Sequence, residues 1–187
     1  MTTGPESPLP PIIALIGFMG AGKTTVGKIL AGKLGYEFVD TDDLIVARAG
    51  APIADIFRRT GEAAFRRMET EALHSLVGRV RTVIAAGGGA PGHESNRTFF
   101  RAHAVTFHLR VSMMNARGRA QTPGGPVRPL LAQEEGEVQR LYDTRRSLYE
   151  AIGQPVETDG RTPHEVAEEI IRLLRGPTES RRIAGKP

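Results

Sequence analysis

The residues with the clearest chemical potential form a glycine-rich segment that ends in lysine and threonine. Residues 17–24, Gly-Phe-Met-Gly-Ala-Gly-Lys-Thr, match the phosphate-loop pattern G-x-x-x-x-G-K-[ST]. An apolar run, Ile12–Ile16, precedes them, and apolar residues at helical spacing follow. Because a chance glycine turn has no reason to join a strand to a helix, we favour a nucleoside triphosphate site over that alternative.

Each residue at the end of this loop has an expected task. The glycines allow the backbone to curl, so that its N–H groups point into one concavity and the following helix adds its positive end. Lys23 is expected to reach the outer phosphates, and Thr24 to place its hydroxyl on Mg²⁺. The full nucleotide-binding set predicted in this segment is Gly20, Ala21, Gly22, Lys23, Thr24 and Thr25.

Two further segments follow apolar runs directly. One carries carboxylate side chains, and the other consists of glycines, whose backbone is open to a ligand. Residues 40–43, Asp-Thr-Asp-Asp, offer one carboxylate for the Mg²⁺ shell and another to accept a proton from a substrate hydroxyl. The alternative is a helix start capped by Thr41 or Asp42, which does not exclude catalysis. Gly87–Gly89 form either a plain turn or a backbone that a ligand approaches closely, and we favour the ligand.

The elements that must position these groups alternate between strand and helix. This alternation predicts an α/β fold, with a parallel sheet covered by helices and ligands at the carboxyl ends of its strands. We expect strands at Ile12–Ile16, Glu37–Val39, Thr82–Ala86, Val105–Val111 and Pro155–Glu157. We expect helices at Gly22–Leu34, Ile53–Phe57, Glu62–Val77, Glu94–Arg101 and Glu134–Ile152, and after the capping sequence Thr162-Pro163-His164-Glu165.

The remaining segments are expected to lack regular structure. Residues 112–129 hold many Gly, Pro and Arg residues without apolar periodicity, which predicts a mobile surface loop. Residues 1–11 and 176–187 are polar and are predicted to be disordered. A single domain over residues 12–175 remains between them.

Composition excludes several other classes of protein. The chain has no cysteine, so disulfides and thiolate metal sites are excluded. A net charge of +4 is compatible with nucleic acid, but 5% aromatic residues and no dense basic run argue against it, and we interpret the arginines as individual anion ligands. No apolar run has membrane-spanning length and no signal peptide is apparent, so we expect a cytoplasmic protein without membrane contact.

Taken in order, the motifs resemble those of the shikimate kinases. The resemblance covers Ile12 to Leu174 and rests on GFMGAGKTT, the DTD of residues 40–42, IADIF followed by GEAAFRRMET, the GGG of residues 87–89, VRPLL at residues 127–131 and R-x-x-L-Y at residues 145–149. It implies a P-loop NTPase three-layer α/β/α sandwich with strand order 2-3-1-4-5, a helical substrate-binding region and a mobile lid at about 112–129. The implied reaction is transfer of the ATP γ-phosphoryl group to the 3-hydroxyl of shikimate, giving shikimate 3-phosphate and ADP on the route to chorismate and the aromatic amino acids. A monomer is the default for this architecture.

The resemblance also implies roles for individual residues. Asp42 binds the shikimate hydroxyls and acts as base, Gly88 offers its N–H to the substrate, and Arg66 and Arg145 bind the substrate. Guanidinium groups grip a carboxylate with two parallel hydrogen bonds, which suits the shikimate anion. On the residues alone, Arg66 would be interpreted as a surface ion pair with Glu62 or Glu69.

The same resemblance extends to the nucleotide and the metal. Arg128 matches the lid arginine that reaches the transferring phosphate, and Arg161 and Pro163 match the segment against adenine. A second lid arginine, Arg117 or Arg119, is left open because the lid is longer than usual. The predicted Mg²⁺ residues are Thr24 and Asp40, since Ala85 stands where some members carry Ser or Thr.

Two alternative functions remain at this stage. A gluconate kinase shares the phosphate loop, but the combination of Arg66, Gly87–Gly89 and Arg145 favours a compact ring carboxylate. A regulatory module that binds nucleotide without phosphotransfer needs no base, so the presence of Lys23 with Asp42 argues against it.

Overall fold

Five short, mostly apolar strands form the centre of the protein. The structure is a computed structural model and describes residues 9–120 and 135–176. All neighbouring strands are parallel and their order is β2-β3-β1-β4-β5, which confirms the predicted fold. The strands are β1 (Ile12–Ile16), β2 (Glu37–Asp40), β3 (Thr82–Ala85), β4 (Val105–Arg110) and β5 (Gln154–Glu157).

The middle strand, β1, is buried along its whole length. Its five residues are at most 2% exposed, and Ala14 pairs with Ile84 of β3 on one side and with Thr106 of β4 on the other. A parallel strand covered on both faces reads as a continuous apolar run instead of an alternating one. The uninterrupted sequence Ile-Ile-Ala-Leu-Ile therefore suits this buried position.

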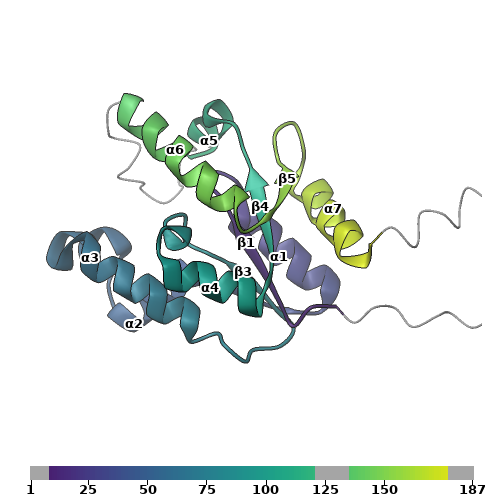
Figure 1. Ribbon diagram of the computed structural model, residues 1–187, viewed down its shortest axis with the longest axis horizontal. Helices are drawn as coiled ribbons and strands as arrows, with labels where there is room; N and C mark the ends of the chain where they lie inside the picture. Colours follow the sequence, from purple (N-terminus) through teal and green to yellow (C-terminus); the bar gives the residue numbers. More distant parts are fainter. Residues whose placement is uncertain (1–8, 121–134, 177–187) are drawn as a thin grey trace, which may run out of the picture.

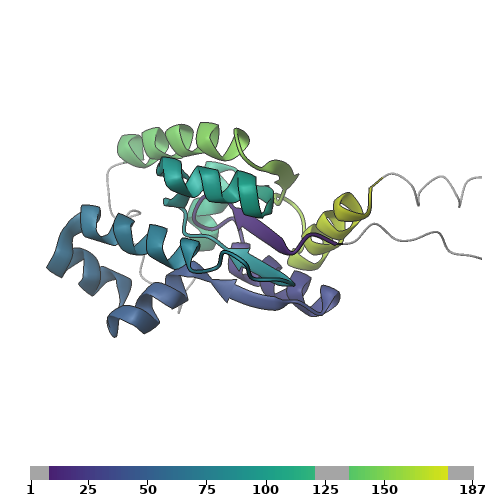
Figure 2. The same cartoon turned by 60° about the horizontal axis from the view of Figure 1, so that its bottom comes forward.

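Helices cover both faces of the sheet and complete the predicted three layers. Figures 1 and 2 show α1 and α7 side by side on one face, α4 and α6 on the other, and α2 and α3 extending from one end of the molecule. The helices are α1 (Lys23–Leu34), α2 (Thr41–Ala49), α3 (Ile53–His74), α4 (Glu94–His103), α5 (Met113–Ala120), α6 (Glu135–Glu150) and α7 (Pro163–Arg175), with a short 3₁₀ turn, η1 (Ala90–Gly92).

The extension formed by α2 and α3 has its own small core. Ile45, Ile56, Phe65 and Ala72 are buried together between the two helices. We predicted two helices in place of α3, and its two parts do meet at a kink, where Gly61 has φ 76° and ψ 172°. Glycine adopts this backbone conformation without the steric cost that other residues incur.

The prediction of a loop from residue 112 onward was wrong for its first part. Met113–Ala120 forms α5, which begins where the Ala116 N–H donates to the Ser112 carbonyl and the Asn115 N–H donates to the Ser112 hydroxyl. Only Ala116 of this helix is fully buried among its described side chains, so no apolar stripe marks it in the sequence. A capping serine was the available signal.

The start of α2 also differs from the prediction. Neither Thr41 nor Asp42 caps this helix; the cap is Asp40, whose Oδ1 accepts the Asp42 N–H at 3.0 Å. The last residue of β2 thus initiates the next helix without an intervening turn.

Pro10 and Pro11, which the prediction placed in the disordered segment 1–11, are instead bonded to the folded domain. The Tyr36 hydroxyl donates to the Pro10 carbonyl at 3.1 Å, and the Thr82 N–H donates to the Pro11 carbonyl at 3.0 Å. Of the segments predicted to be disordered or mobile, residues 1–8, 121–134 and 177–187 lie outside the residues that the structure describes. Within the described parts, no helix has both the length and the apolar character needed to span a bilayer.

The predicted capping box of α7 provides a test of the fold. The Thr162 hydroxyl accepts the Glu165 N–H at 3.3 Å, and Glu165 Oε2 accepts the Thr162 N–H at 2.7 Å. We expect Thr162→Ala to lower the free energy of unfolding by about 1 kcal/mol and Tm by roughly 2–4 °C, because the first turn loses a partner for a backbone donor.

The matched control is Thr98→Ala in the exposed interior of α4, where the hydroxyl only donates back to the Glu94 carbonyl. Alanine is the better helix former there, so Tm should stay constant or rise. Equal Tm losses in both variants, measured by thermal denaturation, would contradict the capping argument.

Candidate active site

The phosphate loop joins β1 to α1 and is closed around its own lysine. The Lys23 ammonium donates to the Gly17 carbonyl at 2.8 Å and to the Phe18 carbonyl at 3.1 Å. Gly22 has φ 89°, a left-handed conformation that ends the loop and lets α1 begin at Lys23. The loop therefore combines a fixed positive charge with the N-terminal end of a helix, which is the chemistry of an anion site.

One hydrogen bond links the end of this loop to the end of β2. The Thr24 hydroxyl donates to Asp40 Oδ2 at 2.8 Å, while the other oxygen of Asp40 caps α2. The pair presents a hydroxyl and a carboxylate beside the loop, and both are hard oxygen ligands. Such a donor set fits Mg²⁺, which binds few protein ligands and completes its shell with phosphate oxygens and water.

The described part of the chain offers no richer metal site nearby. Across residues 9–120 and 135–176, no group of three or more His, Cys, Asp or Glu side chains could hold a metal ion. A cation at Thr24 and Asp40 would therefore depend on oxygens supplied by the nucleotide.

Gly87 lies where two carboxylates meet the backbone. Its N–H donates to the Thr41 hydroxyl at 2.9 Å, directly after β3. A Cβ atom at this position would stand 2.6 Å from Glu69 Oε1 and 2.8 Å from Asp42 Oδ1. Real Cβ atoms do not come this close to other atoms, so the carboxylates can lie here only because residue 87 has no side chain.

Gly89 allows the same close approach by Arg66, while Arg145 lies beside Gly88 at an ordinary contact distance. A Cβ at Gly88 would lie 3.6 Å from Arg145 Nη1, and one at Gly89 would overlap the guanidinium of Arg66, with its Cζ 2.7 Å away. We call residues 87–89 the glycine segment. Two anionic and two cationic side chains from α2, α3 and α6 thus converge on it.

Arg66 is held by two glutamates that differ in exposure. Its Nη1 donates to Glu69 Oε2 at 2.6 Å and its Nη2 to Glu62 Oε1 at 2.9 Å. Glu69 is 3% exposed, whereas the Glu62 side chain is 70% exposed. Burial alone would lower the pKa of Arg66, but the hydrogen bonds and charges of the two glutamates hold that pKa above its ordinary value. The guanidinium is therefore a fixed cation beside the glycine segment.

A single cleft contains the predicted site residues that the structure describes. It runs from the phosphate loop across the ends of β2 and β3 to α6 and the start of α7. Arg128 lies outside the described residues. The predicted residues that line the cleft are Gly20, Ala21, Gly22, Lys23, Thr24, Thr25, Asp40, Asp42, Arg66, Gly88, Arg145 and Arg161.

Two further arginines line this cleft. Arg119, one of the two candidates left open by the sequence, donates to the Thr158 carbonyl at 2.9 Å and to the Gly20 carbonyl at 3.4 Å, so α5 touches the phosphate loop. Arg140 of α6 was not predicted. Nothing in the sequence separated Arg140 from the other arginines of its helix.

Comparison with known proteins agrees with this geometry. The sequence profile of the shikimate kinases matches residues 19–175, which is most of the chain. The chain belongs to the shikimate kinase family. Shikimate kinases from Thermodesulfovibrio yellowstonii and Salinispora arenicola are 41% and 43% identical to it, and the matches cover 89% and 88% of this chain and 98% of each relative.

Solved structures of shikimate kinases are similar to this chain, and a solved structure from outside the family has a similar fold. The chain is similar to shikimate kinase from Acinetobacter baumannii in complex with shikimate, with a TM-score of 0.83 and 37% identity over 88% of this chain and 93% of that one. A gluconokinase from Sinorhizobium meliloti has a TM-score of 0.56 at 19% identity, covering 95% of this chain and 99% of that one. The second likeness shows a shared fold alone.

The unequal exposure of the two Arg66 partners leads to a stability test. We expect Glu69→Gln to lower the free energy of unfolding by roughly 2 kcal/mol, because a buried charged partner of Arg66 is lost. Glu62→Gln removes an exposed partner of the same arginine and should change the free energy of unfolding by less than about 1 kcal/mol. Urea denaturation of both variants makes the comparison, and equal losses would contradict the difference in burial as its cause.

Proposed function

We propose that this protein transfers the γ-phosphoryl group of ATP to the 3-hydroxyl of shikimate, releasing ADP and shikimate 3-phosphate for chorismate and aromatic amino acid biosynthesis. One observation carries the proposal. The phosphate loop and the set Asp42, Arg66, Gly88 and Arg145 line one cleft. Membership of the shikimate kinase family supports the same conclusion.

The glycine segment is the proposed place of shikimate. The substrate is a small ring with one carboxylate and three hydroxyls, so it needs cations at one end and hydrogen-bond acceptors at the other. Arg66 and Arg145 are proposed to bind the carboxylate, since guanidinium groups match its geometry. Asp42 then accepts hydrogen bonds from the hydroxyls, and the Gly88 N–H donates to the ring substituents.

The phosphate loop is the proposed place of the ATP phosphates. Lys23 would exchange its bonds to the Gly17 and Phe18 carbonyls for phosphate oxygens, which carry full negative charge. Thr24 and Asp40 would hold Mg²⁺, which neutralises charge on the phosphate oxygens when it is bound. Arg161, at the start of α7, is proposed to lie against adenine. Arg128 is proposed from the family resemblance as the arginine that reaches the transferring phosphate.

The chemical step follows from this placement. Phosphoryl transfer depends mainly on positioning and on electrostatic stabilisation of the phosphoryl oxygens. Asp42 takes the proton of the attacking hydroxyl, and Lys23 stabilises the charge on the transferred group. In this arrangement the hydroxyl attacks the γ-phosphorus directly and ADP leaves, without a covalent enzyme intermediate.

We propose further that the enzyme acts as a monomer in the cytoplasm, with no nucleic acid or membrane partner. The large apolar side chains exposed in the described parts of the chain are Val46, Val77, Val80, Val105 and Met114; Val77 and Val80 share the loop between α3 and β3, and the other three lie on α2, β4 and α5. The cytoplasm supplies the ATP that the reaction consumes.

The direct test is ADP release by the wild type with Mg-ATP and, in turn, shikimate, quinate, gluconate and nucleoside monophosphates. We expect turnover with shikimate alone. Asp42→Asn should lower kcat at least about 100-fold, since the general base is lost, while ATP still binds. Turnover of gluconate but not shikimate, or full activity of Asp42→Asn, would contradict the proposal.

The glycine segment offers a second test. Gly89→Ala places a methyl group on the Arg66 guanidinium, so we expect the KM for shikimate to rise at least about tenfold, the effect of roughly 1.4 kcal/mol, while the KM for ATP changes little. Gly92→Ala is the matched control, because a Cβ there meets no atom within 4 Å. Similar kinetics in the two variants would show that the segment does not determine substrate binding.

A further inference from the structure

Tyr149 of α6 forms a hydrogen bond to the backbone of the glycine segment. It lies one helical turn after Arg145, is 1% exposed, and donates its hydroxyl hydrogen to the Gly88 carbonyl at 2.6 Å. The bond joins residues 61 positions apart in the chain. The tyrosine ring packs in the main hydrophobic core, and this packing fixes the position of the hydroxyl group.

This bond determines the orientation of a peptide plane in the site. The Gly88 carbonyl and the Gly89 N–H belong to one planar trans peptide unit, so holding the first sets the direction of the second. Glycine has no side chain to restrict its own backbone, and an unsupported glycine segment would sample many conformations. Tyr149 supplies the restraint that the three glycines lack.

The same hydroxyl lies beside Arg145. From the position of a Cβ on Gly88, Tyr149 Oη is 3.8 Å away and Arg145 Nη1 is 3.6 Å away. Burial raises the pKa of Tyr149 well above its ordinary value, and the nearby Arg145 guanidinium only partly opposes the rise. The hydroxyl therefore remains protonated at physiological pH and is always available as the donor to Gly88.

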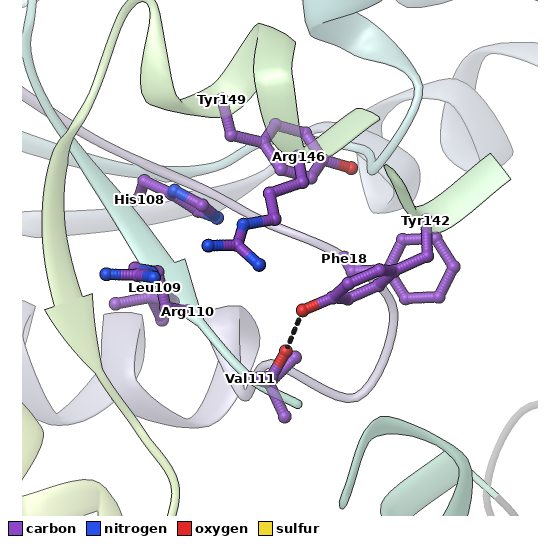
Figure 3. A pocket seen from close by; sticks show the side chains of 8 residues that line it. All are labelled: Phe18, His108, Leu109, Arg110, Val111, Tyr142, Arg146 and Tyr149. Atoms are coloured by element: carbon purple, nitrogen blue, oxygen red, sulfur yellow. Dashed lines mark hydrogen bonds between the residues drawn. The ribbon is translucent and has the colours of Figure 1, made fainter. Parts of the chain in front are cut away.

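The His108 side chain of β4 packs against the ring of Tyr149. Their ring centroids are 5.0 Å apart at an angle of 48°, and Figure 3 shows both rings among the side chains that line one small pocket. His108 is 4% exposed, and burial lowers its pKa to about 4. The imidazole is thus neutral near pH 7, and the uncharged ring packs against the ring of Tyr149.

We propose that Tyr149 is a positioning residue for shikimate, which holds the Gly88–Gly89 peptide, and with it the Gly89 N–H, and the Arg145 guanidinium in the arrangement that receives the substrate. This inference rests on the proposed function. It predicts that the tyrosine hydroxyl affects the shikimate half of the cleft and leaves the ATP half unchanged, although the residue itself touches neither ligand.

Tyr149→Phe tests the inference because it removes only the hydroxyl. We expect the KM for shikimate to rise about 3- to 10-fold, the factor for loss of one hydrogen bond, with little change in kcat or in the KM for ATP. The matched control is Tyr142→Phe on the same helix. Its hydroxyl also donates to a backbone carbonyl, but to that of Val111 at 2.7 Å instead of to the glycine segment, and its ring packs edge-on against Phe18 (Figure 3).

Both variants lose one hydrogen bond and should show similar small decreases in Tm, whereas only Tyr149→Phe should change the KM for shikimate. Equal shikimate KM values in the two variants would overturn the inference and leave Tyr149 a structural residue. Wild-type turnover in the same assay separates the two proposals. Without shikimate turnover the proposed function fails and this inference with it, and with turnover but an unchanged KM only the inference fails.

Discussion

The close approach of charged side chains to a backbone without side chains is the constraint on which this site depends. Asp42, Glu69, Arg66 and Arg145 come from three helices and converge on the glycine segment, and the first three approach it at distances that a Cβ atom would not allow. Opposite charges can share so small a volume because Glu69 and Glu62 pair with Arg66 before any ligand is present. The cost of burying a carboxylate at Glu69 is offset by that pairing.

The parallel sheet explains why these groups meet at all. The carboxyl ends of β1, β2 and β3 lie at one edge, so the phosphate loop, Asp40 and the glycine segment start from neighbouring strands. Asp40 then serves two elements at once, since it caps α2 and accepts the Thr24 hydroxyl of α1. Stability and the proposed metal site therefore rely on the same side chain, and a change at Asp40 would affect both.

Sequence patterns predicted the parts of the molecule that are governed by local rules. The phosphate loop, the apolar strand Ile12–Ile16 and the capping box at Thr162 depend on residues near one another in the chain, and all were found as expected. The strand order came from the family resemblance. Helix α5 was missed because it buries too little apolar surface to leave a periodic pattern.

Contacts between distant segments were beyond such patterns. The spacing of Glu62, Arg66 and Glu69 indicated a possible ion pair, but only the fold shows that Glu69 is buried and lies against Gly87. The bond from Tyr149 to Gly88 joins two motifs that the sequence shows separately.

The central claim is that shikimate binds at the glycine segment, and amide NMR of the uniformly ¹⁵N-labelled protein tests it most directly. Our account predicts that shikimate shifts the signals of Gly88 and Gly89 and leaves in place that of Gly78, which lies in the loop before β3 at the other end of that strand. Saturable shikimate binding with unmoved Gly88 and Gly89 signals would contradict the account.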